Sequence, residues 1–164
     1  LAALTDKLTV EWTPPSDGPE RPCVRVLRAD GTDTGIAFHG VPGGHEFNSF
    51  VVGLYNAAGP GQSIDPALAE AIAAIDRPLD LQIVVALSCT MCPELVIAAQ
   101  KIAASNPLVT AKVYDVNHFP ELRERYKIMS VPCLIINKAK VAFGKKTLGQ
   151  LLELLAEPEA GQTG

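Results

Sequence analysis

The sequence lacks the features that are typical of nucleic-acid-binding, membrane and secreted proteins. Its 164 residues contain 14 lysines and arginines against 18 aspartates and glutamates, so there is no excess of positive charge to attract nucleic acid or an anionic membrane surface. No apolar run approaches the roughly 20 residues that cross a bilayer, and residues 1–7 lack the charged and apolar regions of a signal peptide. We therefore expect a soluble, cytoplasmic protein that binds neither nucleic acid nor membranes.

Cysteine is also scarce. The four cysteines are too few and too unevenly spaced for a secreted scaffold held together by disulfides. The glycine-rich motif of an FAD or pyridine-nucleotide site is absent as well, so we expect no cofactor bound in this chain. The hydrophobic content of 48% can bury a core, and the length suits one medium domain or two small packed units.

Two of the cysteines form a CxxC motif in Ser88-Cys89-Thr90-Met91-Cys92-Pro93. Residues 79–87 read as a buried strand, and apolar residues repeat at helical spacing over 92–105. The motif therefore lies where a strand ends and a helix begins. Cysteines three apart on one face of a first helical turn have Cα atoms roughly 5–6 Å apart, within reach of a disulfide. This pair can open and close reversibly.

The helix terminus suggests a different role for each cysteine. Cys89 lies at the positive end of the helix, where unpaired backbone N–H groups stabilise a thiolate, so it is the predicted nucleophile. Cys92, one turn deeper, is the predicted resolving thiol. Thr90 and Met91 lie between them, and we expect both to contact the substrate.

Ser130-Val131-Pro132 is a second signal. It precedes an apolar strand at 133–136, where a thioredoxin-type fold carries a cis proline that faces its CxxC. The backbone of Val131 would then be free of the sheet and could pair with an extended segment of a partner. We therefore expect Val131 and Pro132 to bind substrate. A trans proline at the start of a strand is the simpler alternative.

The order of elements in residues 79–156 predicts an α/β fold. The expected elements are strands at 81–87, 108–116, 134–136 and 141–143, and helices at 92–105, around Leu122 and at 148–156. This βαβαββα order is that of a glutaredoxin-like thioredoxin unit, with a mixed sheet between helices. The last helix has a capping-box pattern at Thr147 and Gln150.

Residues 1–78 resemble the second half of the same fold. The pattern predicts strands at 8–12, 24–28 and 35–38, a linking helix at 67–75 capped by Asp65 and Pro66, and an earlier helix whose apolar face is Phe47, Phe50, Val51, Leu54 and Tyr55. No CxxC occurs here. We therefore predict a truncated, redox-inactive thioredoxin-like unit with its linking helix (1–78), a redox-active unit (79–156) and a linker or tail (157–164).

Taken together, these residues resemble the N-terminal domain of the alkyl hydroperoxide reductase flavoprotein (F) subunit, a tandem of two thioredoxin-like units of which only the second has a CxxC. The matching runs are Leu4-Thr5-Asp6-Lys7-Leu8-Thr9, Gly43-Gly44-His45-Glu46-Phe47-Asn48-Ser49, Ser88-Cys89-Thr90-Met91-Cys92-Pro93, Asn106-Pro107, Ser130-Val131-Pro132 and Thr147-Leu148. A Gly-His-Glu-Phe run ahead of Ser-Cys-x-x-Cys-Pro is far more specific than a CxxC alone.

The resemblance implies a protein disulfide reductase, or dithiol electron-transfer domain, that serves peroxide detoxification. It would relay electrons from a flavoprotein disulfide reductase, fused or separate, to a disulfide-containing partner such as a peroxiredoxin. FAD and NAD(P)H would then be bound by the reductase. The family also places the Glu46 carboxylate near the CxxC, where a raised pKa would suit proton exchange with a cysteine. From the residues alone, Glu46 is simply an acidic residue in a first helical turn.

Other interpretations remain open at this point. One is a free-standing glutaredoxin-like protein or protein disulfide oxidoreductase, and another is a non-catalytic binding module whose CxxC holds a metal or a static disulfide. An iron–sulfur cluster that bridges two chains is a minor alternative. A structural zinc site needs a second ligand pair, and only Cys23, Cys133 and three scattered histidines are available. We therefore expect no metal site, and we expect Cys23 and Cys133 to be small buried side chains.

Overall fold

The computed structural model describes residues 5–14, 18 and 20–158. These residues contain one six-stranded mixed sheet in the order β1-β2-β4-β3-β5-β6. The strands are β1 (Cys23–Leu27), β2 (Asp33–His39), β3 (Leu79–Val85), β4 (Val109–Asp115), β5 (Cys133–Ile136) and β6 (Lys140–Phe143). The helices are α1 (Glu46–Ala58), α2 (Pro66–Ala73), α3 (Cys92–Ser105), α4 (Pro120–Arg125) and α5 (Leu148–Ala156).

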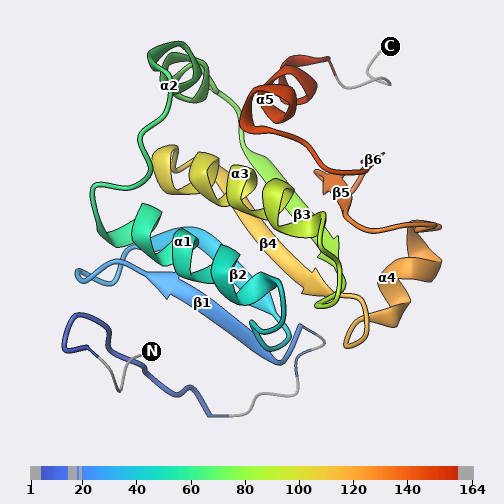
Figure 1. The fold of residues 1–164 in the computed structure, drawn as a ribbon, viewed down its shortest axis with the longest axis horizontal. Helices are drawn as coiled ribbons and strands as arrows, with labels where there is room; N and C mark the ends of the chain where they lie inside the picture. Colours follow the sequence, from blue (N-terminus) through green and yellow to red (C-terminus); the bar gives the residue numbers. More distant parts are fainter. Residues whose placement is uncertain (1–4, 15–17, 19, 159–164) are drawn as a thin grey trace.

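The helices cover the two faces of the sheet unequally. Helices α1, α2, α3 and α5 lie on one face, where α1 and α3 run side by side (Figure 1) and enclose the larger hydrophobic core. Helix α4 and the residues before it pack on the other face, over a smaller core that includes Val84, Tyr114 and Cys133. Strand β3 is central and buried on both faces, so the CxxC loop that follows it starts from a rigid base.

The structure confirms the predicted elements of the second segment. Helix α3 begins at Cys92 and ends at Ser105, as expected from its apolar spacing. The capping box of α5 is formed, because Thr147 Oγ1 accepts from the Gln150 amide at 3.3 Å and Gln150 Oε1 accepts from the Thr147 amide at 3.0 Å. In the first segment, the side chain of Asp65 caps α2 in the predicted way, because it accepts a hydrogen bond from the backbone amide of Ala67 at 2.8 Å.

Two predictions for the first segment are wrong. Residues 8–12 form no strand, and Trp12 is 91% exposed. An alternating pattern makes a strand only where a neighbouring strand pairs with it, and these residues join no ladder of the sheet. The expected apolar face of α1 is wrong at its two edges, although Phe50 and Leu54 do pack against the core. Phe47 and Tyr55 are about half exposed, whereas the buried residues of α1 are Glu46, Ser49, Gly53, Asn56 and Ala57.

The two segments of the chain share one sheet. Strand β2 pairs in parallel with β4, with Ile36 opposite Ala111 and His39 opposite Tyr114. The first segment therefore extends the sheet of the second and places α1 against α3. The division into units at residue 78 stays a prediction, and most of the predicted tail at 157–164 lies outside the described residues.

Candidate redox site

Cys89 and Cys92 form a disulfide with their Cα atoms 5.6 Å apart. Cys89 lies in the turn after β3 and is partly exposed, whereas Cys92 is the first residue of α3 and is fully buried. A visiting protein therefore meets the sulfur of Cys89 first. Only the neighbouring Cys89 sulfur is open to attack by Cys92, which is the geometry that a nucleophile and a resolving thiol require.

The start of α3 provides the electrostatic environment of the pair. The N-cap residue Met91 makes no side-chain capping hydrogen bond, so the N-cap side chain gives the first backbone N–H groups of the helix no acceptor. Cys89 lies just outside this helix end, in the turn that leads into it. The ammonium group of Lys145 lies 3.8 Å from the carboxylate of Glu94 in the first turn of α3. The positive charge of Lys145 is therefore paired with the negative charge of Glu94.

The Val131-Pro132 segment lies beside the disulfide. The peptide bond between these residues is cis, and the Val131 carbonyl oxygen is 4.0 Å from Cys89 Sγ. Strand β5 starts only at Cys133, so the backbone of Val131 lies outside the sheet. Thr90 and Met91, which directly follow Cys89 in the sequence, are exposed. The structure thus gathers all four predicted substrate-binding residues around Cys89, and their roles stay predictions.

The loop before α1 is fixed to the loop that carries the CxxC. The amide of His45 donates to the carbonyl oxygen of Leu87 at 2.9 Å, two residues before Cys89. Gly44 has a φ of +53°, and a Cβ there would lie 2.4 Å from the same oxygen, so only glycine allows this close approach. The N-terminus of α1 is therefore held next to the redox pair.

Glu46, the first residue of α1, is fully buried. Its Oε2 accepts a hydrogen bond from Ser49 Oγ, and its Oε1 has no partner among the described residues. Burial raises the pKa of this carboxyl to about 7, and the Ser49 hydrogen bond opposes the shift only in part. Because α1 and α3 start at the same end of their interface (Figure 1), the buried residues Glu46 and Cys92 share that end.

Ser49 is a site residue that the sequence patterns did not single out. Its hydroxyl also donates to the backbone oxygen of Glu46 at 3.0 Å, one turn back along the helix. The available signal was its spacing of three residues from Glu46, which places the two side chains on one helix face.

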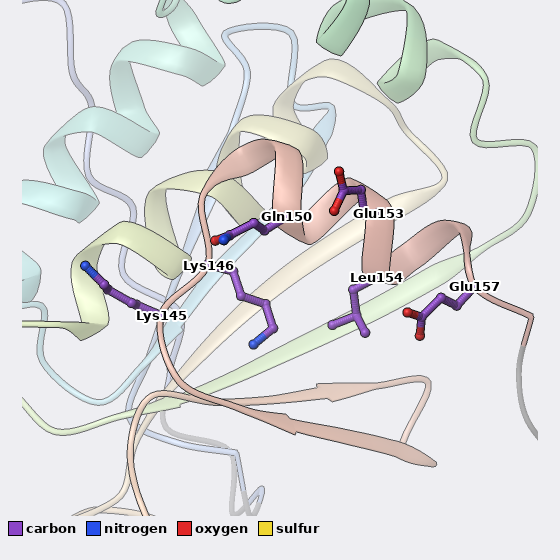
Figure 2. Close-up of a pocket in the computed structure, with 6 residues that line it drawn as sticks. All are labelled: Lys145, Lys146, Gln150, Glu153, Leu154 and Glu157. Carbon is purple, nitrogen blue, oxygen red and sulfur yellow. The ribbon is translucent and has the colours of Figure 1, made fainter.

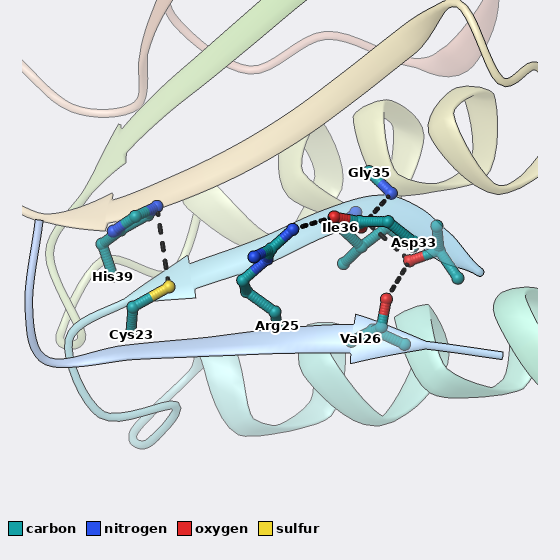
Figure 3. Close-up of polar contacts among 8 residues, drawn as sticks. Cys23, Arg25, Val26, Asp33, Gly35, Ile36 and His39 are labelled. Atoms are coloured by element: carbon teal, nitrogen blue, oxygen red, sulfur yellow. Dashed lines mark hydrogen bonds and ion pairs between the residues drawn. The ribbon is translucent and has the colours of Figure 1, made fainter. Parts of the chain in front are cut away.

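The two other cysteines are not part of this site. Cys23 is only partly buried, against expectation, and its Sγ lies 3.8 Å from Nε2 of His39 (Figure 3). Burial raises the pKa of Cys23, and it raises the pKa of the fully buried Cys133 to about 11. Both are therefore protonated and poorly reactive at neutral pH.

A metal ion and a dinucleotide each need a particular arrangement of residues to bind. The described residues contain no group of three or more histidine, cysteine or acidic side chains placed to hold a metal ion. A dinucleotide-binding fold needs a glycine-rich turn between a strand and a helix, but here the turn from β3 to α3 holds the CxxC. No helix of the described residues is long and apolar enough to span a bilayer.

A shallow pocket lies away from the disulfide, next to β6 and α5 (Figure 2). It is lined by Lys145, Lys146, Gln150, Glu153, Leu154 and Glu157. The Lys140 ammonium group pairs with Glu157 at 2.6 Å near one end. No predicted site residue lines this pocket.

Comparison with known proteins shows what the chain is similar to. A family model of the thioredoxin domain matches residues 79–156. The alkyl hydroperoxide reductase F subunit of Pseudomonas aeruginosa is 33% identical over 161 residues, which are 98% of this chain and 30% of that protein. The chain thus spans about a third of the length of the curated relatives it matches.

Solved structures agree with these sequence matches. A crystal structure of an N-terminal domain of the alkyl hydroperoxide reductase F subunit of Enterococcus faecalis superposes with a TM-score of 0.80 at 42% identity, covering 84% of this chain and 66% of that one. A protein disulfide oxidoreductase from Aeropyrum pernix has a TM-score of 0.72 at 23% identity, over 82% of this chain and 58% of that one. The second likeness shows the fold alone, which is a thioredoxin-like α/β fold.

The buried carboxyl predicts a pH dependence of stability. The pKa of Glu46 is higher in the folded chain than in the unfolded chain, so the folded state binds the extra proton and loses stability as pH rises from about 4.5 to about 7. We expect Glu46→Gln to remove this loss, which is on the order of 3 kcal/mol by the size of the shift. The measurement is the free energy of unfolding of the oxidised protein at pH 5 and pH 8.

The exposed Glu124 provides the matched control, because Glu124→Gln should keep the pH dependence of the wild type. A Glu46→Gln variant whose stability changes with pH as the wild type does would contradict the assignment.

Proposed function

Because this chain belongs to the family of the alkyl hydroperoxide reductase F subunit, as its thioredoxin-fold N-terminal domain, we propose that its Cys89–Cys92 pair relays electrons from a flavoprotein reductase to a disulfide-containing protein. A peroxiredoxin is the proposed acceptor, so that the relay serves peroxide reduction. FAD and NAD(P)H belong to the reductase, whether fused to this chain or separate. The observation that carries the proposal is the disulfide itself, which joins a partly exposed Cys89 to a fully buried Cys92 beside Val131.

The reaction is a dithiol exchange. The Cys89 thiolate attacks the partner disulfide, and one partner sulfur leaves as a thiolate, giving a mixed disulfide. Cys92 then attacks Cys89 Sγ, which closes the Cys89–Cys92 bond and releases the second partner thiolate. The partner gains two electrons and this chain loses two, which the reductase replaces by reducing the bridge.

The surroundings of the pair support docking of an extended peptide. The backbone of Val131 lies outside the sheet and can pair with a partner strand, which would align the partner disulfide with Cys89. Thr90 and Met91 are exposed next to Cys89 and would contact the same peptide. Cys92 would stay buried while the partner makes these contacts, and it would react only after the mixed disulfide has formed.

Glu46 is the proposed acid–base group of the exchange. Resolution requires that the Cys92 thiol lose its proton inside a region that water does not reach freely. A carboxyl with a pKa of about 7 accepts a proton and returns it at neutral pH, and Glu46 is buried at the end of the α1–α3 interface where Cys92 lies.

Cysteine variants test the relay directly. We expect Cys89→Ser to lose electron transfer entirely, because the attacking sulfur is gone. Cys92→Ser should accumulate a mixed disulfide with the partner, because nothing resolves it. Reductase-coupled transfer to a peroxiredoxin and non-reducing electrophoresis measure these two outcomes.

Cys23→Ser is the control for these variants and should behave as the wild type, since Cys23 lies outside the site. Full transfer activity in Cys89→Ser would refute the relay. Reduction of general disulfide substrates without any preference for a peroxiredoxin would favour the alternative, a free-standing protein disulfide oxidoreductase.

The role of Glu46 predicts a change in kinetics. The carboxylate accepts a proton only when ionised, so the exchange rate of the wild type should rise with pH through about 7. Glu46→Gln should slow exchange roughly tenfold or more and alter the pH profile of Cys89 alkylation. Glu121→Gln, in the exposed first turn of α4, is the control. An unchanged profile in Glu46→Gln would leave Glu46 with a purely structural place in its helix.

A further inference from the structure

The interface between α1 and α3 buries polar side chains where helix pairs usually bury apolar ones. Glu46 and Ser49 of α1 and Gln100 of α3 are fully buried, and Asn56 of α1 is 8% exposed. Buried side-chain atoms without a hydrogen-bond partner are found only here among the described residues: Oε1 of Glu46 and both amide atoms of Gln100. A buried polar atom without a partner destabilises the fold, so the presence of three such atoms in one interface needs an explanation.

Helix geometry places these groups in one line. A Cβ on Gly53 would lie 2.6 Å from Gln100 Oε1, so the amide of Gln100 lies against the α1 backbone at Gly53. The two helices run side by side in the same direction (Figure 1). Glu46 lies two turns before Gly53, and Cys92 lies a similar distance before Gln100, so these two residues are level along the interface. Ser49 lies between Glu46 and Gly53.

The line continues to the protein surface at the far end of α1. Asn56 Nδ2 donates to Gln62 Oε1 at 2.9 Å, and the backbone N–H of Gln62 donates to Asn56 Oδ1 at 2.8 Å. Lys101 Nζ donates to the Gln62 carbonyl oxygen at 2.8 Å. Gln62 and Lys101 are both partly exposed. We call Glu46, Ser49, Gln100, Asn56 and Gln62 the polar seam.

Two local costs meet at the middle of the seam. Gly53 is in the interior of α1, where glycine is less favourable than alanine. An alanine there would collide with the Gln100 amide. An apolar residue at position 100 with an alanine at position 53 would fill the same interface without these two costs. The combination of Gly53 and Gln100 is therefore better explained by what the Gln100 amide binds than by stability.

We propose that the polar seam binds internal water and carries protons between Glu46 and the surface at Gln62, with Gln100 as the residue that positions this water. The inference rests on the proposed function, because the proton it carries is the one released by Cys92. As Cys92 attacks Cys89 Sγ, its proton passes to the Glu46 carboxylate and the partner leaves as a thiolate. The protonated Glu46 then releases that proton through the seam to bulk water, which restores the carboxylate.

Apart from Cys92, the ionisable groups near α1 have partners of their own. The ionisable side chains on the elements packed against α1 are Cys92, Glu94 and Lys101 on α3, Cys23 and Arg25 on β1, and Asp33 and His39 on β2. Arg28, directly after β1, donates to the carbonyl oxygens of Ala57 and Ala104. Glu94 pairs with Lys145, Arg25 pairs with Asp33, and Cys23 contacts His39. The pKa of Glu46 is set by burial and by Ser49, with no contribution from these groups.

The first test uses the oxidised wild-type protein. Nuclear Overhauser contacts between water and the side-chain amide protons of Gln100 should report a long-lived internal water, and the exposed amide of Gln150 should show only rapidly exchanging solvent. A Gln100 amide without a long-lived water contact would overturn the proposal. This test needs no variant, so it holds even if substitutions disturb folding.

The second test removes the amide while keeping its volume. In Gln100→Met we expect carbon-13 titration to show the ratio of ionised to protonated Glu46 about tenfold lower near pH 7, because the carboxylate loses its water. Gln82→Met, the same change at a buried glutamine of β3 that bonds Asp80, should leave that titration unchanged. A wild-type titration of Glu46 in Gln100→Met would also overturn the proposal.

Neither test involves a reductase or an acceptor protein. If Gln100 binds no long-lived water, the cysteine variants still test the relay. If the cysteine variants contradict the relay, the water contacts of Gln100 can still be measured.

Discussion

The close packing of α1 on α3 is the constraint on which the rest of this structure depends. It buries Glu46 and Cys92 at the same end of one interface, and it does so because β2 pairs with β4 and so brings both helices to one face of the sheet. The hydrogen bond from His45 to Leu87 then fixes the start of α1 beside the loop of the redox pair. Without this packing the carboxyl would be exposed, and its pKa would return towards the ordinary value.

This arrangement gives the segment without a CxxC a specific part in the proposed chemistry. Residues 1–78 contribute neither cysteine of the disulfide, yet they supply the buried carboxyl of Glu46 at the end of the α1–α3 interface where Cys92 begins α3. The same segment adds β1 and β2 to the sheet of the second. In the proposed relay, the group that exchanges a proton with the resolving cysteine is therefore supplied by a helix of the other segment.

Local signals in the sequence were sufficient for much of the fold. The limits of α3, the capping box of α5 and the cap of α2 depend on residues close together in the chain, and the structure has them as expected. The strand expected at 8–12 failed because an alternating pattern does not specify a pairing partner. The buried face of α1 was predicted only in part: Phe50 and Leu54 pack against the core as their spacing indicates, but the packing of Gly53 against Gln100, far away in the sequence, has no local signal. The position of Val131 and Pro132 beside Cys89 followed from the order of elements, but the burial of Glu46 did not.

The central claim is that Cys89 and Cys92 are a reversible two-electron couple while Cys23 and Cys133 remain thiols. Equilibration of the wild-type protein in glutathione buffers of graded potential, followed by differential alkylation and mass spectrometry of each cysteine, tests it most directly. The account predicts that Cys89 and Cys92 change state together in one reversible transition, with Cys23 and Cys133 alkylated throughout. A pair that fails to re-form its bridge, or a bridge between any other two cysteines, would contradict it.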